Sequence, residues 1–320
     1  MFQTELLHLL QSLENGFFIG FMKFISFFGG TTALMLTIFF IMFSINFKKG
    51  WILVNILLCG SIVSRTLKSY VNYPRPLAVD TTLKTFGNNV GETNLRDLEP
   101  KTFFESFSPA LLEKARTNTE IDNGFPSGHM VLITTLWLGI SILFARKIIL
   151  LISILLIFLT GISRMYLAQH YLGDVLGGMT AGLLVIILFS VLILNQSELN
   201  FLLELKRSGE ILQKNKNMII IMGLPLLGLL FYHHAPLNRV AEITAVNLSV
   251  VIISYKKFPF AFGVWWKRAI TVVTAILLYI GCSALFSRII GNEILSAFLT
   301  TFCCWTISGL VLNFVNSKNN

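Results

Sequence analysis

Long runs of apolar residues, separated by short polar turns, form the main pattern along the chain. A helix needs about 20 predominantly apolar residues to cross a bilayer, and most of these runs approach that length. The pattern therefore predicts an all-α, polytopic membrane helical bundle with about nine transmembrane helices. The first predicted span is part of 16–46. The others are 50–68, 128–145, 147–164, 171–195, 218–232, 240–254, 269–287 and 294–314.

One connection, residues 72–126, is much longer than the other turns between apolar runs. Connections of this length are uncommon and are usually functional or disordered. This one contains several phenylalanines and a helix-start signal at Ser108-Pro109, with Ser as the cap and Pro at the first helical position. We expect a partly ordered lid.

The composition supports a membrane protein and excludes an ordinary soluble enzyme. Hydrophobic residues make up 54% of the chain and charged residues 13%, whereas soluble domains carry about 25% charged residues. The four cysteines all lie inside apolar runs, so we interpret them as packing residues and not as disulfide or metal ligands. They are Cys59, Cys282, Cys303 and Cys304.

The net charge of +9 is distributed as a topology signal. Lys and Arg are concentrated in the turns at 47–50, 145–148, 196–217 and 255–268, which contain few acidic residues. Because basic residues favour the cytoplasmic side, these turns are predicted to be cytoplasmic and the long loop extracytoplasmic. The pattern indicates a multi-pass protein of the cell inner membrane, or of the endoplasmic reticulum if the source is eukaryotic, and does not favour nucleic-acid binding.

Three polar stretches lie on the predicted extracytoplasmic side, each at the edge of an apolar run. They are Lys68 to Pro76 (KSYVNYPRP), Phe125 to His129 (FPSGH) and Ser163 to Asp174 (SRMYLAQHYLGD). Taken singly, each has a simple explanation: a lysine extending to the interface, a helix cap, or a polar pair at a helix end. Together they place several ionisable side chains near membrane depth, where such residues are rare and tend to be functional.

The residue types in these stretches suit chemistry on a phosphate. His170 and Asp174 are four positions apart, so on a helix they share one face and the carboxylate can orient the imidazole. Arg offers a planar fork for phosphate oxygens and Lys a point charge. Ser127 and Gly128 open a helix, whose free backbone N–H groups bind anions.

The three stretches resemble the signature motifs of the type 2 phosphatidic acid phosphatase (PAP2) superfamily: K-x6-RP, PSGH and SR-x5-H-x3-D. The resemblance implies that His170 is the nucleophile, that Asp174 orients it, and that His129 is the general acid and later the base. It further implies a phosphohistidine intermediate, no cofactor and no metal ion. The residues implied to bind the substrate phosphate are Lys68, Arg75, Ser127, Gly128 and Arg164.

The resemblance covers about residues 16–195. We therefore expect a catalytic membrane core at 1–200, with residues 72–126 as its extracytoplasmic lid, and additional transmembrane helices of unassigned role at 201–320. The long loop and the extra helices resemble the sphingosine-1-phosphate phosphatase and glucose-6-phosphatase branches. Asp174 points to the lipid-phosphate members, because the glucose-6-phosphatase type lacks an Asp at that position.

The expected function is metal-independent hydrolysis of a lipid phosphate monoester or diphosphate at the extracytoplasmic face, with the bilayer itself as the other partner. The residues leave alternatives open: a sugar-phosphate phosphatase, a lipid phosphotransferase, or an anion transporter in which the cationic pocket carries out no chemistry. Transporters often show inverted repeats and helices broken at matching positions, and the sequence has no convincing repeat. It does not indicate an oligomeric state.

Overall fold

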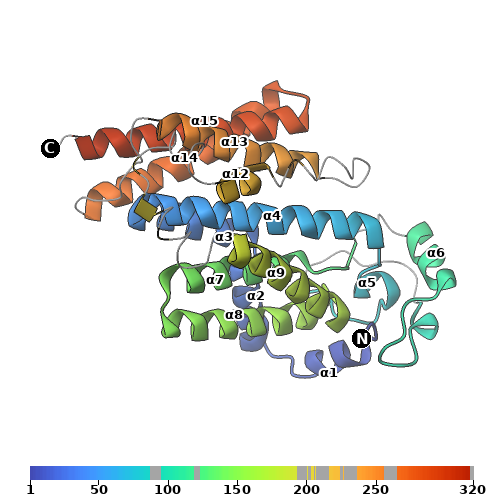
Figure 1. Cartoon of the computed structure of the whole chain (residues 1–320). Helices are drawn as coiled ribbons and strands as arrows, with labels where there is room; N and C mark the ends of the chain where they lie inside the picture. The colour runs from blue at the N-terminus through green and yellow to red at the C-terminus, as the bar shows by residue number, and fades with distance from the viewer. Residues whose placement is uncertain are drawn as a thin grey trace. The chain divides into compact units, whose positions relative to one another are not determined.

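The computed structural model of the chain describes residues 1–86, 95–118, 123–192, 216–223, 236–255 and 265–317, and the single positions 200, 203, 204, 206 and 226. Over these residues the protein forms helices and turns with no β-strand, which confirms the predicted all-α class (Figure 1). The chain divides into two compact units. The first unit is Met1–Ala33 with Val63–Leu184, and the second is Leu34–Ile62 with Val185–Asn320. The predicted functional division into 1–200 and 201–320 stays a prediction.

The first unit contains all three polar stretches singled out in the sequence. Its elements are α1 (Glu5–Gln11), α2 (Gly16–Phe28), the C-terminal part of α4 (Phe47–Val71), α5 (Pro76–Val79), the 3-10 helix η2 (Arg96–Leu98), α6 (Pro109–Asn118), α7 (Gly128–Phe144), α8 (Lys147–Tyr166) and most of α9 (Leu172–Leu192).

Helices α7, α8 and α9 lie side by side in this unit, and α2 packs against α8 (Figure 1). Two glycines of α9, four residues apart, allow α7 to approach closely. A Cβ atom on Gly178 would lie 2.5 Å from the Ser127 carbonyl oxygen, and one on Gly182 would lie 2.8 Å from Cβ of Thr134. Small residues permit this kind of backbone contact between membrane helices. The contact fixes the start of α7, where Ser127 lies, against α9.

The second unit is built from α3 (Thr31–Phe40, from Leu34 on), the π-helix η1 (Ile41–Ile45), the N-terminal part of α4, α12 (Lys216–Gly223), α13 (Leu237–Ile253), α14 (Trp265–Ile289) and α15 (Glu293–Ser317). In it, α15 packs against both α13 and α14. Aromatic rings contribute to the core: the centroid of Trp305 lies 5.4 Å from that of Phe39 and 5.8 Å from that of Phe43.

Several helices are long and apolar enough to cross a membrane, which indicates a multi-pass membrane protein. Five of the described helices qualify by themselves. Helices α2 and α3–η1, which are bent by 53° at Gly29-Gly30, would form a sixth span if they are counted together. The expected number of about nine is therefore not confirmed. Two predicted spans form helices of only 17 residues, α7 and α13, and α13 also carries Arg239 and Glu242. The run at 218–232 lies largely outside the described residues.

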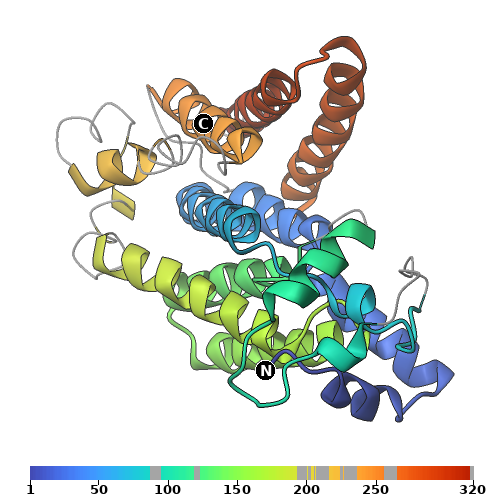
Figure 2. The same cartoon turned by 90° about the vertical axis from the view of Figure 1, so that its right-hand side faces the viewer.

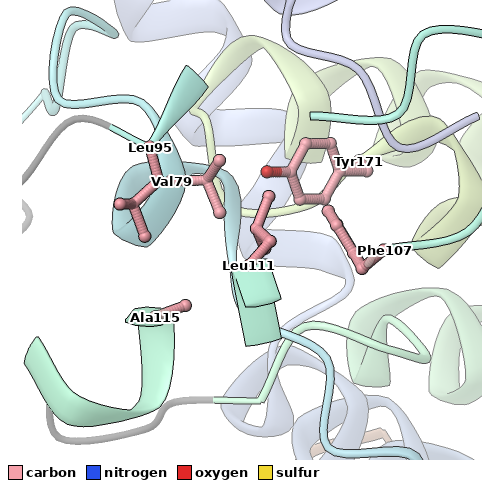
Figure 3. Packing of buried hydrophobic residues seen from close by; sticks show 6 residues of the cluster. All are labelled: Val79, Leu95, Phe107, Leu111, Ala115 and Tyr171. Atoms are coloured by element: carbon pink, nitrogen blue, oxygen red, sulfur yellow. The ribbon is translucent and has the colours of Figure 1, made fainter. Parts of the chain in front are cut away.

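The described parts of the long loop fold around a hydrophobic cluster of their own. Helices α5 and α6 both contribute residues to this cluster. The loop lies toward the viewer in Figure 2. The predicted helix start is confirmed: α6 begins at Pro109, and the Leu111 N–H donates to Ser108 Oγ at 3.2 Å. The cluster includes Tyr171, which follows His170 directly (Figure 3). Its buried members are Val79, Leu95, Phe107, Leu111, Ala115 and Tyr171.

The N-terminal segment is tied to the same loop by buried polar contacts. The Thr4 N–H and hydroxyl both donate to Glu99 Oε2, at 3.2 and 3.0 Å. The His8 ring contacts the buried Asp80 carboxylate at 2.8 Å. Leu7 packs with Leu77, Leu83 and Ala168. The loop thus packs against both α1 and the turn before His170.

Candidate active site

All eight residues predicted from the motifs lie at helix ends or in adjoining turns of the first unit. Lys68 is in the last turn of α4, and Arg75 caps the N-terminus of α5. Ser127 occupies the N-cap position of α7, and Gly128 and His129 are the first two residues of the helix. Arg164 is in the last turn of α8, His170 is in the turn after it, and Asp174 is in the first turn of α9.

The three stretches meet through short contacts. The Lys68 ammonium donates to the Asn123 carbonyl oxygen at 2.5 Å, just before the second stretch. The Ser127 N–H donates to the Asp174 carbonyl oxygen at 2.9 Å, which joins the second stretch to the third. A Cβ atom on Gly128 would lie 3.8 Å from Cε of Lys68. The three stretches therefore lie next to one another in the first unit.

The two arginines share one acceptor. Arg75 Nη1 donates to Gln169 Oε1 at 2.7 Å, and Arg164 Nη2 lies 3.5 Å from the same oxygen. Guanidinium groups held in this way present several N–H donors in a fixed orientation, which suits the oxygens of a phosphate. Gln169 occupies a position that the motif leaves unspecified, so motif reading could not identify it.

His170 and Asp174 form the expected pair. His170 Nδ1 lies 3.3 Å from Asp174 Oδ2, and both side chains are buried, at 2% and 1% exposed. The same oxygen accepts the Tyr171 N–H at 3.0 Å. His170 lies in the turn before α9, so the two residues meet across the helix start and not along a helical face as the spacing suggested. The carboxylate thereby fixes the orientation of the ring.

The turn that presents His170 has an unusual backbone. Ala168 is buried and has φ = 52°, in the left-handed region that an L-residue adopts at a cost. Two backbone hydrogen bonds hold the turn: the Ala168 N–H donates to the Met165 carbonyl oxygen and the Gln169 N–H to that of Arg164. Strained residues of this kind persist where the surrounding structure holds them in place, often at functional sites.

The electrostatic environment keeps His170 neutral. Burial, followed by the positive charges of Arg164, Lys68 and Arg75, lowers the pKa of His170 well below its usual value. At neutral pH, one of the two ring nitrogens of His170 is therefore unprotonated. If Nδ1–H donates to Asp174, the lone pair is on Nε2, which is the form a nucleophile needs.

Among the buried side-chain atoms without a hydrogen-bond partner in the described part of the chain are Ser127 Oγ and Asp174 Oδ1 of the site. Ser127 and Asp174 are both fully buried. Buried hydroxyl and carboxylate oxygens almost always have partners, so such atoms need an explanation. Ser127 Oγ, beside Gly128 and Lys68, is placed to donate to a ligand.

A cavity of about 350 Å³ lies next to these residues. His129, Arg164 and Gln169 line it from the motif stretches, and Phe86 and Leu167 add apolar surface. The rest of the described lining comes from α2, the turn after it and the first turn of α3: Lys23, Ser26, Phe27, Gly30 and Thr32. His170 is not among the described lining residues.

Helix α2 also positions Arg164, and the sequence analysis did not predict this role of the helix. Arg164 Nη1 donates to Ser26 Oγ at 2.8 Å, and the neighbouring Ser163 hydroxyl donates to the Met22 carbonyl oxygen at 2.6 Å. The break after α2 approaches His129: a Cβ atom on Gly29 would lie 3.2 Å from Cδ2 of His129. The Gly29-Gly30 pair was the only sequence signal for this contact.

The described residues contain no cluster of three or more His, Cys, Asp or Glu side chains suited to a metal ion. The expectation that the protein needs no metal or other cofactor stays a prediction.

Comparison with known families agrees with the motifs. Residues 49–198 match the family model of the PAP2 superfamily. No curated protein and no solved structure gives a significant match to the chain. The matched segment contains all eight motif residues, whereas α2 precedes it. Residues 49–198 therefore belong to the PAP2 superfamily, and this membership implies phosphatase activity.

Proposed function

We propose that the protein is a metal-independent phosphatase that hydrolyses a lipid phosphate through a phosphohistidine intermediate. The observation that carries the proposal is the buried His170–Asp174 pair, at 3.3 Å, surrounded by Arg164, Lys68 and Arg75. A neutral imidazole held by a carboxylate is a nucleophile, and the cations match the charge of a phosphoryl group.

In the first step, His170 Nε2 attacks phosphorus and a P–N bond forms while the bond from phosphorus to the leaving oxygen breaks. His129 donates a proton to that oxygen. In the second step, His129 removes a proton from water, whose oxygen attacks phosphorus, and the P–N bond breaks to release inorganic phosphate. Asp174 holds the His170 ring in its reactive orientation and stabilises its positive charge.

The anion-binding groups stabilise the charge of the transition state. Ser127 Oγ and the backbone N–H groups at the start of α7 donate to phosphoryl oxygens. Arg75 and Arg164 exchange their hydrogen bonds to Gln169 for bonds to the substrate, and Lys68 adds a point charge. Gly128 lets the phosphate approach the backbone.

A lipid substrate is supported by the surroundings of the cavity. Phe17, Phe24 and Phe27 of α2 are 83%, 58% and 49% exposed, and Phe27 lines the cavity. Exposed aromatic side chains on a membrane helix suit contact with lipid. A lipid headgroup can reach His129 and Arg164 from this side while its chain stays in the bilayer.

The charge distribution supports an extracytoplasmic site. The turn between α7 and α8 carries Arg146 and Lys147, and it joins the ends of these helices that are remote from His129 and Arg164. Basic residues favour the cytoplasmic side of a membrane. The site is then on the other side.

A substrate panel tests the proposal. The purified full-length protein in mixed detergent–lipid micelles is assayed for phosphate release from lipid monophosphates, lipid diphosphates and glucose 6-phosphate, with and without EDTA. We expect turnover of a lipid phosphate that EDTA does not reduce. Loss of activity in EDTA would contradict the metal-independent mechanism, turnover of glucose 6-phosphate alone would contradict a lipid substrate, and anion binding without turnover of any substrate would contradict an enzyme.

A further inference from the structure

One face of α2 forms a wall of the cavity beside the site. Lys23, Ser26 and Phe27 line it, at the helical spacing i, i+3 and i+4, and Gly30 adds to the lining just after the helix ends. This helix lies outside the segment 49–198 that matches the PAP2 family model. The wall is therefore a feature of this chain that the three motifs do not specify.

Lys23 lies close to the phosphate-binding groups. Its neighbour one turn along α2, Ser26, accepts a hydrogen bond from Arg164 Nη1 at 2.8 Å. Three residues along a helix correspond to a rise of about 5 Å. His129 and Arg164 line the same cavity as Lys23. A group bound between Arg164 and Lys23 would therefore adjoin His129, the residue that protonates the leaving oxygen.

The Lys23 ammonium group forms no hydrogen bond or ion pair with any residue in the described part of the chain. It lies on a helix whose exposed neighbours are Phe21, Phe24 and Phe27. A charged residue on an apolar membrane helix is costly and tends to be functional. A lysine near a membrane interface can also extend to the lipid headgroups, and that role would not discriminate between substrates.

We propose that Lys23 is a specificity-determining residue that binds a second anionic group on the leaving-group side, so that the preferred substrate is a lipid diphosphate. This inference rests on the proposed phosphatase function. The terminal phosphorus is attacked by His170, the bond from it to the bridging oxygen breaks, and a lipid monophosphate leaves. Its negative charge lies between Arg164 and Lys23.

The size of the cavity agrees with this substrate. At about 350 Å³, it is near the lower limit for small-molecule sites. It suits a charged headgroup, whereas the lipid chain would lie along the exposed phenylalanines of α2. A lipid monophosphate has a neutral alcohol as its leaving group and gains nothing from a cation at this position.

The test compares Lys23→Met with the wild-type full-length protein, using farnesyl diphosphate and farnesyl monophosphate in mixed micelles. The readout is kcat/KM for each substrate, with products separated by chromatography. We expect the ratio of the diphosphate value to the monophosphate value to fall about tenfold, because the attraction between the ammonium and the second phosphate is lost. Lys23→Arg should keep most of the preference.

Lys147→Met is the matched control, since it removes the same charge at the far end of α8 and should leave the ratio unchanged. A ratio unaltered by Lys23→Met, in a folded protein that hydrolyses farnesyl phosphates, would overturn this inference alone. The same holds if Lys23→Met lowers both values equally. Wild-type protein that hydrolyses neither farnesyl phosphate, but hydrolyses glucose 6-phosphate, would overturn the lipid phosphatase function and this inference with it.

Discussion

Two clusters of buried polar side chains, one in each unit, differ in whether their atoms find partners within the protein. In the second unit, Trp51, Asn55 and Asn247 bond to one another. Asn55 Nδ2 donates to Asn247 Oδ1 at 3.1 Å, Asn247 Nδ2 donates back to Asn55 Oδ1 at 3.0 Å, and Trp51 Nε1 donates to Asn247 Oδ1 at 2.8 Å. This cluster is neutral and satisfied by its own members.

The cluster in the first unit is charged and incomplete. Ser127 Oγ and Asp174 Oδ1 have no partner among the described residues, and the charges of Lys68, Arg75 and Arg164 all act on His170. A self-satisfied polar cluster holds helices together, whereas one with unused donors and surplus positive charge can bind an anion. Substitutions in the two clusters should therefore affect different properties.

The largest effect is expected from His170→Ala. Removing the nucleophile should lower kcat by about 10⁴-fold or more, because no other group can form the covalent intermediate. The measurement is phosphate release from the best substrate of the panel, together with thermal unfolding of the variant. Near wild-type turnover by a folded variant would refute the phosphohistidine mechanism.

Asp174→Asn should have the second largest effect. The amide keeps the shape of the side chain but not its charge, so His170 Nδ1 loses the carboxylate that sets its tautomer. We expect kcat to fall by about 10³-fold, with a much smaller change in KM. If KM alone rises, Asp174 contributes to substrate binding and not to orientation of the nucleophile.

Asn247→Ala should affect stability and leave catalysis nearly unchanged. The variant removes the oxygen that accepts the Trp51 indole N–H and one of the two hydrogen bonds donated by Asn55 Nδ2, which costs about 1–3 kcal/mol. Thermal unfolding in detergent should show a lower Tm, while kcat/KM of the folded fraction stays within about twofold. A large loss of activity at unchanged Tm would remove the distinction between the clusters.

The smallest effect concerns a third buried polar contact, between Glu99 and Thr4. Burial raises the pKa of Glu99 to about 7 against the opposing hydrogen bonds from Thr4. Because the folded state holds this proton more tightly than the unfolded state, the contribution of Glu99 to stability is present at acidic pH and is lost as pH rises from about 4.5 to 7.

Glu99→Gln should remove this dependence, because an amide does not titrate in this pH range. Limited proteolysis of the N-terminal segment between pH 5 and 8 measures it. The wild-type segment should become more sensitive as pH rises, and the variant should not. Equal pH dependence in both proteins would show that another group is responsible.

The comparison also explains which structural features could be predicted from the sequence. The His170–Asp174 pair, the helix start at Pro109 and the meeting of the three motif stretches were all predictable, because each depends on local spacing or on helices that end on one side of a membrane. The number of membrane spans was not predictable. Hydrophobicity marks apolar runs but does not show that α7 is only 17 residues long or that the chain bends at Gly29-Gly30.

The sequence by itself determined the helical membrane class, the family of residues 49–198 and the residues of the motifs, since these depend on composition and on short spacings within one segment. Only the tertiary structure brought Ser26 to Arg164, Gln169 between the two arginines, and Lys23 to the cavity beside His129. These contacts join residues that are far apart in the chain or that the motifs leave unspecified. The contacts of Ser26 and Lys23 arise from the packing of α2 against α8, which has no local signature in the sequence.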